Sequence, residues 1–127
     1  MIGYVAAALG GVLGALARWG VAEAFPSPVG GWPWATLLVN LTGCALIGAL
    51  LALLLARHPD SPWLRPFLAT GVLGGYTTFS TFAVETVRLV EDGAVALAGG
   101  YVLVSVVGGV LAVAAGLTAG RAVVSRP

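Results

Sequence analysis

The 127-residue sequence contains no lysine, one histidine and one cysteine, and each shortage excludes a class of protein. Without lysine or any run of basic residues, the chain lacks the positive surface that nucleic acid requires. The single cysteine, Cys44, cannot form an intrachain disulfide, and the single histidine, His58, provides neither a metal cluster nor a histidine-based catalytic triad. We therefore expect neither an enzyme nor a nucleic-acid-binding protein.

Charge is scarce along the whole chain. Only 9% of the residues are charged, whereas about a quarter are charged in a typical soluble domain. Hydrophobic residues make up 59% of the chain, and they gather in stretches long enough to cross a bilayer, which takes about 20 residues. The composition predicts an integral, multi-pass protein of the cell (inner) membrane.

Four hydrophobic blocks are separated by polar or proline-bearing segments. They cover about residues 2–22, 34–56, 63–90 and 94–124. Only a helix satisfies its own backbone hydrogen bonds over such lengths in lipid, so we expect a single all-α domain, residues 1–127, with four transmembrane helices. Trp32, Trp34 and Trp63 lie at the block ends, where interfacial aromatic residues belong.

Glycines recur at helical spacing in three of these blocks. The pairs, each four residues apart, are Gly10 and Gly14, Gly71 and Gly75, and Gly116 and Gly120. The members of each pair share one helix face and let another backbone approach. We expect them to mark tight helix–helix contacts.

The arginines give only a weak orientation. One side of the membrane would carry Arg57, Arg65, Arg121 and Arg126, and the other Arg18 and Arg88. This bias favours cytoplasmic termini, but a chain with so few basic residues could insert in both orientations. Arg18 and Arg88, near helix ends, could extend to the interface or give a vestibule a positive potential.

The third block contains an unusual polar stretch, GVLGGYTTFSTFAVE, at residues 71–85. Two glycines and two β-branched threonines, Gly74, Gly75, Thr77 and Thr78, weaken the helix interior there. We predict a break near the middle of this helix. Such a break is either a tolerated kink between packed helices or a site where freed backbone groups meet water or an ion.

Polar side chains inside the spans need partners or a function. Asn40 is either a helix-to-helix hydrogen-bonding residue or a neutral donor in a pathway, and Thr36 lies one turn before it on the same face. Tyr101 and Ser105 repeat that spacing in the fourth block. These residues could line a polar path through the membrane.

Two aromatic rings and one acid complete the candidates. Phe79 and Phe82 share a helix face, where they either face lipid or direct their positive ring edges at an anion. Glu85 could carry a coupled proton, bond to Thr81 or lie near the membrane edge. Its role, and those of Ser80 and Thr81, stay open at this stage.

Three segments, GGVLGALAR (10–18), TLLVNLTG (36–43) and GVLGGYTTFSTFAVE (71–85), resemble the Fluc family of fluoride channels, also called CrcB. The resemblance covers the whole chain in length, helix count and motif order. It implies a passive, highly selective fluoride channel that confers fluoride resistance by letting toxic cytoplasmic fluoride leave the cell. It also implies an antiparallel, dual-topology homodimer with two pores, embedded in lipid.

The same resemblance assigns roles to residues. It implies that Asn40 is the pore-lining amide and that Phe79 and Phe82 turn their ring edges to fluoride. The other residues that it implicates are Thr36, Tyr101 and Ser105 in a polar track, Arg18 in a vestibule, and Gly74 and Thr77, whose backbone carbonyls would hold a structural sodium ion at the dimer interface.

The principal alternative is a small dual-topology, proton-coupled multidrug or cation transporter. Such proteins have four helices but depend on a membrane-embedded glutamate in the first helix, where this chain has no acid before Glu23. A structural subunit without transport would need no aligned polar side chains on three helices.

Overall fold

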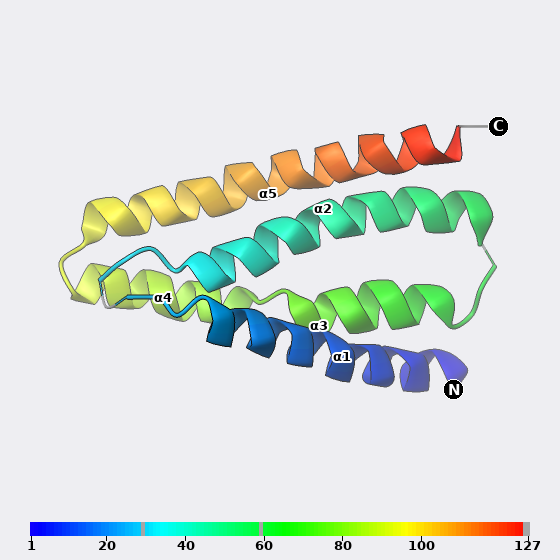
Figure 1. Ribbon diagram of the computed structural model, residues 1–127, viewed down its shortest axis with the longest axis horizontal. Coiled ribbons are helices and arrows are strands. Elements are labelled where there is room, and N and C mark those ends of the chain that lie inside the picture. Colours follow the sequence, from blue (N-terminus) through cyan, green and yellow to red (C-terminus); the bar gives the residue numbers. More distant parts are fainter. Residues whose placement is uncertain (29, 59, 126–127) are drawn as a thin grey trace.

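The computed structural model describes residues 1–28, 30–58 and 60–125 (Figure 1). All regular elements within these residues are helical, and four long apolar stretches of helix are each long enough to cross a membrane. The third stretch is interrupted, as predicted. The elements are α1 (Ile2–Ala24), α2 (Trp34–Arg57), the π-helical η1 (Pro66–Leu73), α3 (Gly74–Tyr76), α4 (Phe79–Glu91) and α5 (Val95–Val124).

The helix ends follow from local sequence. α1 ends just before the first proline of the first connection, and Pro33 lies directly before α2, since proline cannot continue a helix. α4 ends in a Schellman-type cap, in which the N–H of Ala94 bonds to the Leu89 carbonyl and that of Gly93 to the Val90 carbonyl. Gly93 has a φ of 78°, which glycine adopts without strain.

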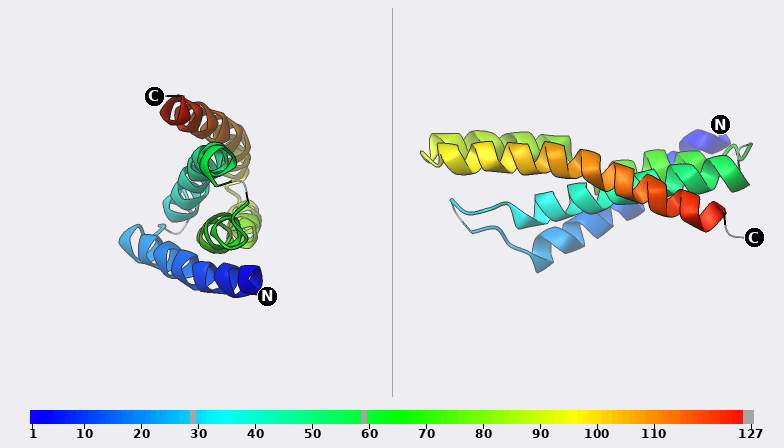
Figure 2. Two further views of the ribbon diagram at one scale, coloured as in Figure 1. Left: turned by 90° about the vertical axis from the view of Figure 1, so that its right-hand side faces the viewer. Right: turned by 90° about the horizontal axis from the view of Figure 1, so that it is seen from above.

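The helices pack as two close pairs. α5 lies along α2, and α1 lies along η1 and α3, while α4 reaches back to α5 (Figure 2). The predicted glycine pairs lie in these contacts. A methyl group at Gly14 would collide with the Val72 carbonyl, and one at Gly116 with the Ala45 carbonyl, so only glycine lets these backbones meet.

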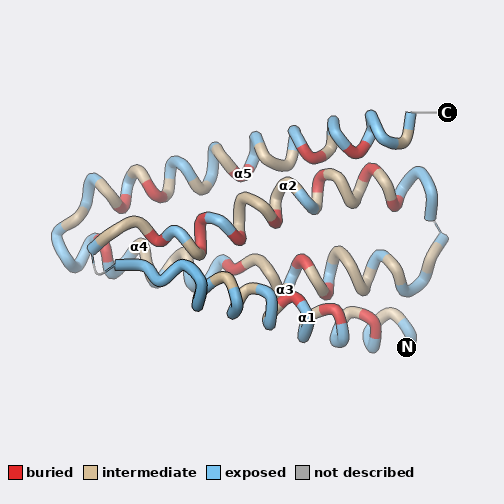
Figure 3. Tube along the Cα trace, viewed as in Figure 1, coloured by how far each residue is buried: buried red, intermediate tan, exposed pale blue. Residues whose placement is uncertain are grey.

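The chain buries little of its own surface. Figure 3 shows long exposed stretches on α1 and α5, and large apolar side chains such as Leu103 and Val110 lie on the outside. Apolar groups facing outward over the length of four helices suit contact with lipid tails, which are as apolar as the side chains themselves.

The start of α1 and the end of α5 lie at the same end of the bundle, as an even number of spans requires (Figure 1). Of the arginines used to predict orientation, Arg126 lies outside the described residues.

Candidate functional site

The third span breaks at two threonines, not at the glycines that precede them. Gly74 keeps helical angles (φ −65°, ψ −35°), whereas Thr77 (φ −78°, ψ 160°) and Thr78 (φ −148°, ψ 123°) are extended. The β-branched side chains therefore occupy the backbone conformation that they prefer. The glycines act differently: Gly75 lets η1 and α3 press against the Gly11 carbonyl of α1.

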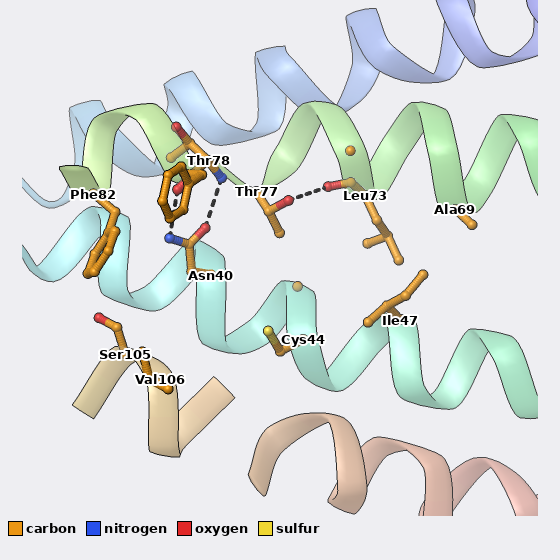
Figure 4. A pocket seen from close by; sticks show the side chains of 13 residues that line it. Asn40, Cys44, Ile47, Ala69, Leu73, Thr77, Thr78, Phe82, Ser105 and Val106 are labelled. Carbon is orange, nitrogen blue, oxygen red and sulfur yellow. Dashed lines mark hydrogen bonds between the residues drawn. The ribbon is translucent and has the colours of Figure 1, made fainter. Parts of the chain in front are cut away.

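The Asn40 side chain forms hydrogen bonds with both backbone groups of Thr78, in the break (Figure 4). Its Nδ2 donates to the Thr78 carbonyl at 2.9 Å, and its Oδ1 accepts from the Thr78 N–H at 2.8 Å. That N–H would bond to the Gly74 carbonyl in an uninterrupted helix, so the amide takes over a hydrogen bond that the break removes. The interpretation of Asn40 as a helix-to-helix hydrogen-bonding residue is confirmed.

Asn40 retains capacity for a second role. Its Nδ2 carries two hydrogens and Thr78 uses one, so one amide N–H remains available to the cavity that Asn40 lines.

Thr78 also starts the second half of the span. Its hydroxyl oxygen accepts from the backbone N–H of Thr81 at 3.2 Å, and its hydroxyl donates to Thr81 Oγ1 at 2.9 Å. Thr78 is thus the N-cap of α4, and only 7% of it is exposed. Ser80 Oγ lies 3.4 Å from the same hydroxyl, so Ser80 and Thr81 gather around the cap, on the exposed side of the helix start.

A cavity of about 440 Å³ opens beside the break, between the third span, α2 and α5 (Figure 4). Asn40, Phe79, Phe82 and Ser105 all border it, and so do Gly74 and Thr77. The two phenyl rings have centroids 5.9 Å apart and planes inclined at 44°, which confirms that they share one side of α4. Phe79 is 80% exposed, so its ring projects beyond the surface of the single chain.

Glu85 lies in a buried polar network that joins three helices. Its Oε1 accepts from the Thr36 hydroxyl and its Oε2 from the Tyr101 hydroxyl, each at 2.8 Å. Thr36 is buried, and Tyr101 is 0% exposed. The bond between Glu85 and Thr81 that their spacing allows is not formed, and the Glu85 oxygens accept from Thr36 and Tyr101 instead.

Tyr101 and Ser105, predicted to lie along one face, have different surroundings. Ser105 borders the large cavity, whereas the Tyr101 ring lies against Phe82, with centroids 5.2 Å apart, and its hydroxyl bonds to Glu85. Tyr101 does not border either of the two cavities described here.

Arg18 lies on the other side of the break. Its Nη1 donates to the Thr77 carbonyl at 3.3 Å, and it borders a second cavity of about 290 Å³ between α1, α2 and α4. Thr36 and Thr81 also line this cavity, and Thr78 lines both cavities. Thr78 therefore lies between the cavity lined by the Arg18 guanidinium and the cavity lined by the Asn40 amide and the two phenyl rings.

Sequence reasoning missed two parts of this arrangement. Thr78 follows an N-cap pattern, since a threonine just before a helical run is a start signal, but that signal is hard to read inside a hydrophobic block. The second is a contact between the Thr42 and Tyr76 hydroxyls at 3.0 Å. The Thr42 hydroxyl already donates to the Leu38 carbonyl at 2.7 Å, so Tyr76 donates to Thr42 and ties α3 to α2.

Among the described residues, no cluster of three or more histidine, cysteine, aspartate or glutamate side chains could hold a metal ion.

Comparison with known proteins gives one family and several close relatives. The family described as "CrcB-like protein, Camphor Resistance (CrcB)" matches residues 5–117. The fluoride-specific ion channel FluC of Bordetella petrii is 50% identical over 122 residues, which cover 95% of this chain and 93% of that protein. FluC of Paracoccus denitrificans is 51% identical over 118 residues (93% and 94%), and FluC 2 of Nocardia farcinica 47% identical over 116 residues (91% and 80%).

Proposed function

The chain belongs to the CrcB family, and on that basis we propose that it is a passive, fluoride-selective channel that lets fluoride leave the cell. The observation that carries the proposal is that relatives about half identical over nearly the whole chain are named as fluoride-specific channels. The cavity beside the helix break adds support, because it supplies neutral donors suited to a small anion.

The donors act without formal charge. Fluoride is small and strongly hydrated, so close donors must replace its water shell. Asn40, which keeps one free N–H, lines the same cavity as Ser105, Phe79 and Phe82. A hydroxyl can donate to an anion, and a phenyl ring has a positive edge. Because none of these groups is charged, they hold an anion weakly enough for it to leave, as conduction requires.

Arg18 supplies the attraction that these groups lack. Its guanidinium borders the second cavity, and Thr78 separates that cavity from the donors. A positive charge beside a low-dielectric wall raises the local concentration of anions. We assign Arg18 to the approach of the ion and Asn40, Phe79 and Phe82 to its passage.

The test is fluoride efflux from liposomes that contain the purified protein, followed with a fluoride electrode while a potassium ionophore balances charge. We expect rapid fluoride release without chloride release. The Phe79→Ile variant removes one ring edge, and Asn40→Asp replaces the free amide donor by a carboxylate, so both should lose most of the flux. A well-folded wild-type protein that releases no fluoride would refute the proposal.

The proposal includes a homodimer, argued from what a single chain leaves uncovered. Phe79, Gly74, Ser80 and Thr81 are exposed in the middle of a membrane span. Backbone and hydroxyl groups facing lipid cost several kcal/mol each when unpaired, roughly 2–7 in an apolar medium. A second copy packed against the break would cover them.

We infer that the two copies run antiparallel, because the arginines barely favour one orientation. In a Cys44→Ala background, a cysteine introduced by Ser125→Cys should react with an impermeant maleimide from both sides of sealed vesicles, about half from each side. Labelling from one side only would refute dual topology and leave the channel proposal intact.

A sodium ion held by the Gly74 and Thr77 carbonyls fits the break. The Thr78 N–H that would occupy the Gly74 carbonyl binds Asn40 instead, and the Thr77 carbonyl accepts from Arg18 but keeps a second lone pair. Freed carbonyls of broken helices are the ligands that sodium takes in membrane proteins, and a bound cation would stabilise the break. We expect the thermal midpoint in sodium to exceed that in N-methylglucamine, and equal midpoints would refute the site.

The coupled-transporter alternative is not supported. Glu85, the acid that could carry a proton, has both oxygens occupied by hydroxyl donors, and the relatives reported above are named as channels.

A further inference from the structure

The Trp32 side chain packs inside the bundle, although a tryptophan at a membrane interface does not need to. It lies in the connection between α1 and α2, in the sequence Gly-Trp-Pro-Trp (Figure 1). Trp34, two residues later, is 56% exposed, as expected of a residue at the membrane surface. Trp32 instead turns inward and packs against the buried cluster of Leu37, Leu89, Ala98 and Tyr101.

The turn before Trp32 directs it there. Gly30 has a φ of 70°, and the Gly31 N–H bonds to the Pro28 carbonyl at 3.0 Å, which closes a turn. The Trp34 N–H then bonds to the Trp32 carbonyl at 2.9 Å. The backbone on both sides of Trp32 is therefore fixed, and the indole has a defined direction.

The indole stacks on Trp34, with centroids 5.8 Å apart, and it joins a continuous chain of aromatic contacts that ends in the ion cavity. Trp32 meets Tyr101 edge to face, with centroids 6.4 Å apart and planes at 88°. Tyr101 meets Phe82 at 5.2 Å, and Phe82 meets Phe79 at 5.9 Å. All three distances lie in the range where aromatic pairs are attractive, about 4.5–7 Å.

Tyr101 connects the aromatic contacts to the hydrogen bond with Glu85. Its ring is held between Trp32 and Phe82, and its hydroxyl donates to Glu85 Oε2 at 2.8 Å. A phenol that could rock would lengthen this bond and release Phe82 from its contact. We propose that Trp32 is a positioning residue: it holds the Tyr101 ring edge to face, and so fixes the bond to Glu85 and the orientation of Phe82 in the cavity.

This inference rests on the proposed channel function only for its effect on flux, so its first test does not involve transport. The chain has three tyrosines, Tyr4, Tyr76 and Tyr101, and 3-fluorotyrosine can replace all of them. The Tyr101 fluorine resonance is assigned with Tyr101→Phe. Because the indole lies against that ring, we expect Trp32→Leu to shift the resonance, and Trp32→Phe to shift it less, since a ring remains.

The matched control is Trp63→Leu. Trp63 belongs to the connection between α2 and η1, which lies at the opposite end of the bundle from the connection between α1 and α2 (Figure 1). Removing Trp63 should therefore leave the Tyr101 resonance in place. If Trp32→Leu does not form a folded protein, Trp32→Met serves as the ring-free variant. A Tyr101 resonance that is unchanged in the ring-free variant would overturn the inference.

The second test is a double-mutant cycle on fluoride flux. An edge-to-face pair changes an equilibrium constant about 2- to 12-fold, so we expect Trp32→Leu to lower flux by that factor and Trp32→Phe to restore it to within about twofold. In a Tyr101→Leu background both the ring that Trp32 holds and the bond to Glu85 are absent, and Trp32→Leu should then cost less than about twofold. An equal loss in both backgrounds would show that Trp32 does not act through Tyr101 and would overturn the inference. A wild-type protein without fluoride flux would refute the proposed function instead, and the fluorine resonance would still decide the role of Trp32.

Discussion

Replacing Asn40 by alanine should open the break in the third span locally. The change removes two hydrogen bonds to Thr78, at 2.9 and 2.8 Å, and leaves the N–H and carbonyl of a 93% buried residue (7% exposed) without their partners. An unpaired buried group costs about 1–3 kcal/mol, and hydrogen bonds between membrane helices average about 0.6 kcal/mol with a maximum near 1.7. We therefore expect about 2–4 kcal/mol of local destabilisation.

That energy can be measured at the Thr78 amide. Hydrogen exchange through local opening would become about 30- to 700-fold faster in Asn40→Ala, at about 1.4 kcal/mol per factor of ten. Leu38→Ala, on the same helix but partly exposed, is the matched control and should leave the Thr78 exchange rate unchanged.

Asn40→Asp separates the structural role from the ion-binding role. The carboxylate keeps an acceptor for the Thr78 N–H but loses the donor to the Thr78 carbonyl and the free N–H in the cavity. We expect it to keep most of the Thr78 protection while losing fluoride flux. If the Thr78 amide exchanges at the wild-type rate in Asn40→Ala, the amide does not hold the break, and this account of Asn40 is wrong.

Three further changes test other contacts. Gly14→Ala forces a methyl group into the Val72 carbonyl and should lower the thermal midpoint, at a cost of about 1–3 kcal/mol. Gly11→Ala is the control, because a methyl group there meets nothing within 4 Å and should leave the midpoint unchanged. Equal effects of the two variants would refute the close approach of α1. Thr78→Val removes the N-cap and should cost about 1 kcal/mol in thermal unfolding, and Thr78→Ser should restore it, so a stable valine variant would contradict the cap. Glu85→Gln leaves one acceptor for two hydroxyl donors and should cost about 1–3 kcal/mol, a loss that is absent if the network contributes nothing.

Much of the fold could be predicted because it depends on local pattern. The four spans follow from runs of apolar residues, and the structure places the helices within a few residues of the predicted bounds. The closure of the third span at Glu91, Asp92 and Gly93 follows from the conformational freedom of glycine. The glycine pairs could be assigned to helix contacts because a spacing of four residues fixes a shared face.

The break was predicted in the right region, but the prediction named the two glycines and the two threonines together and did not separate their roles. Helix propensity marks Gly74 and Gly75 as the weak points, yet both remain in α3 while Thr77 and Thr78 are extended. The reason is tertiary: α1 approaches so closely that glycine is required within the helix, and Asn40 provides hydrogen bonds at Thr78 that the helix would otherwise provide. A weak propensity scale cannot rank these two contributions.

The hydrogen-bond partners of Glu85 could not be predicted from the local sequence pattern. Thr36 is 49 residues away and Tyr101 is 16 residues away, on two other helices, so periodicity within one helix could not pair them. The inward turn of Trp32 is similar, because a tryptophan at the end of an apolar block is typical of the membrane interface and nothing local distinguishes it from Trp34.

Counting donors shows which of the predicted pathway residues can bind an anion as they stand. Each hydroxyl has one hydrogen, and Thr36 and Tyr101 both give theirs to Glu85, so they present only lone pairs, which repel fluoride. Asn40 keeps one free N–H, and in the described part of the chain the Ser105 hydroxyl has no hydrogen-bond partner. Thr36 and Tyr101 can therefore serve the ion only if Glu85 releases them. It follows that Thr36→Val should reduce fluoride flux less than Asn40→Asp does in the same liposome assay. A larger loss in Thr36→Val would mean that Glu85 gives up these hydroxyls during conduction.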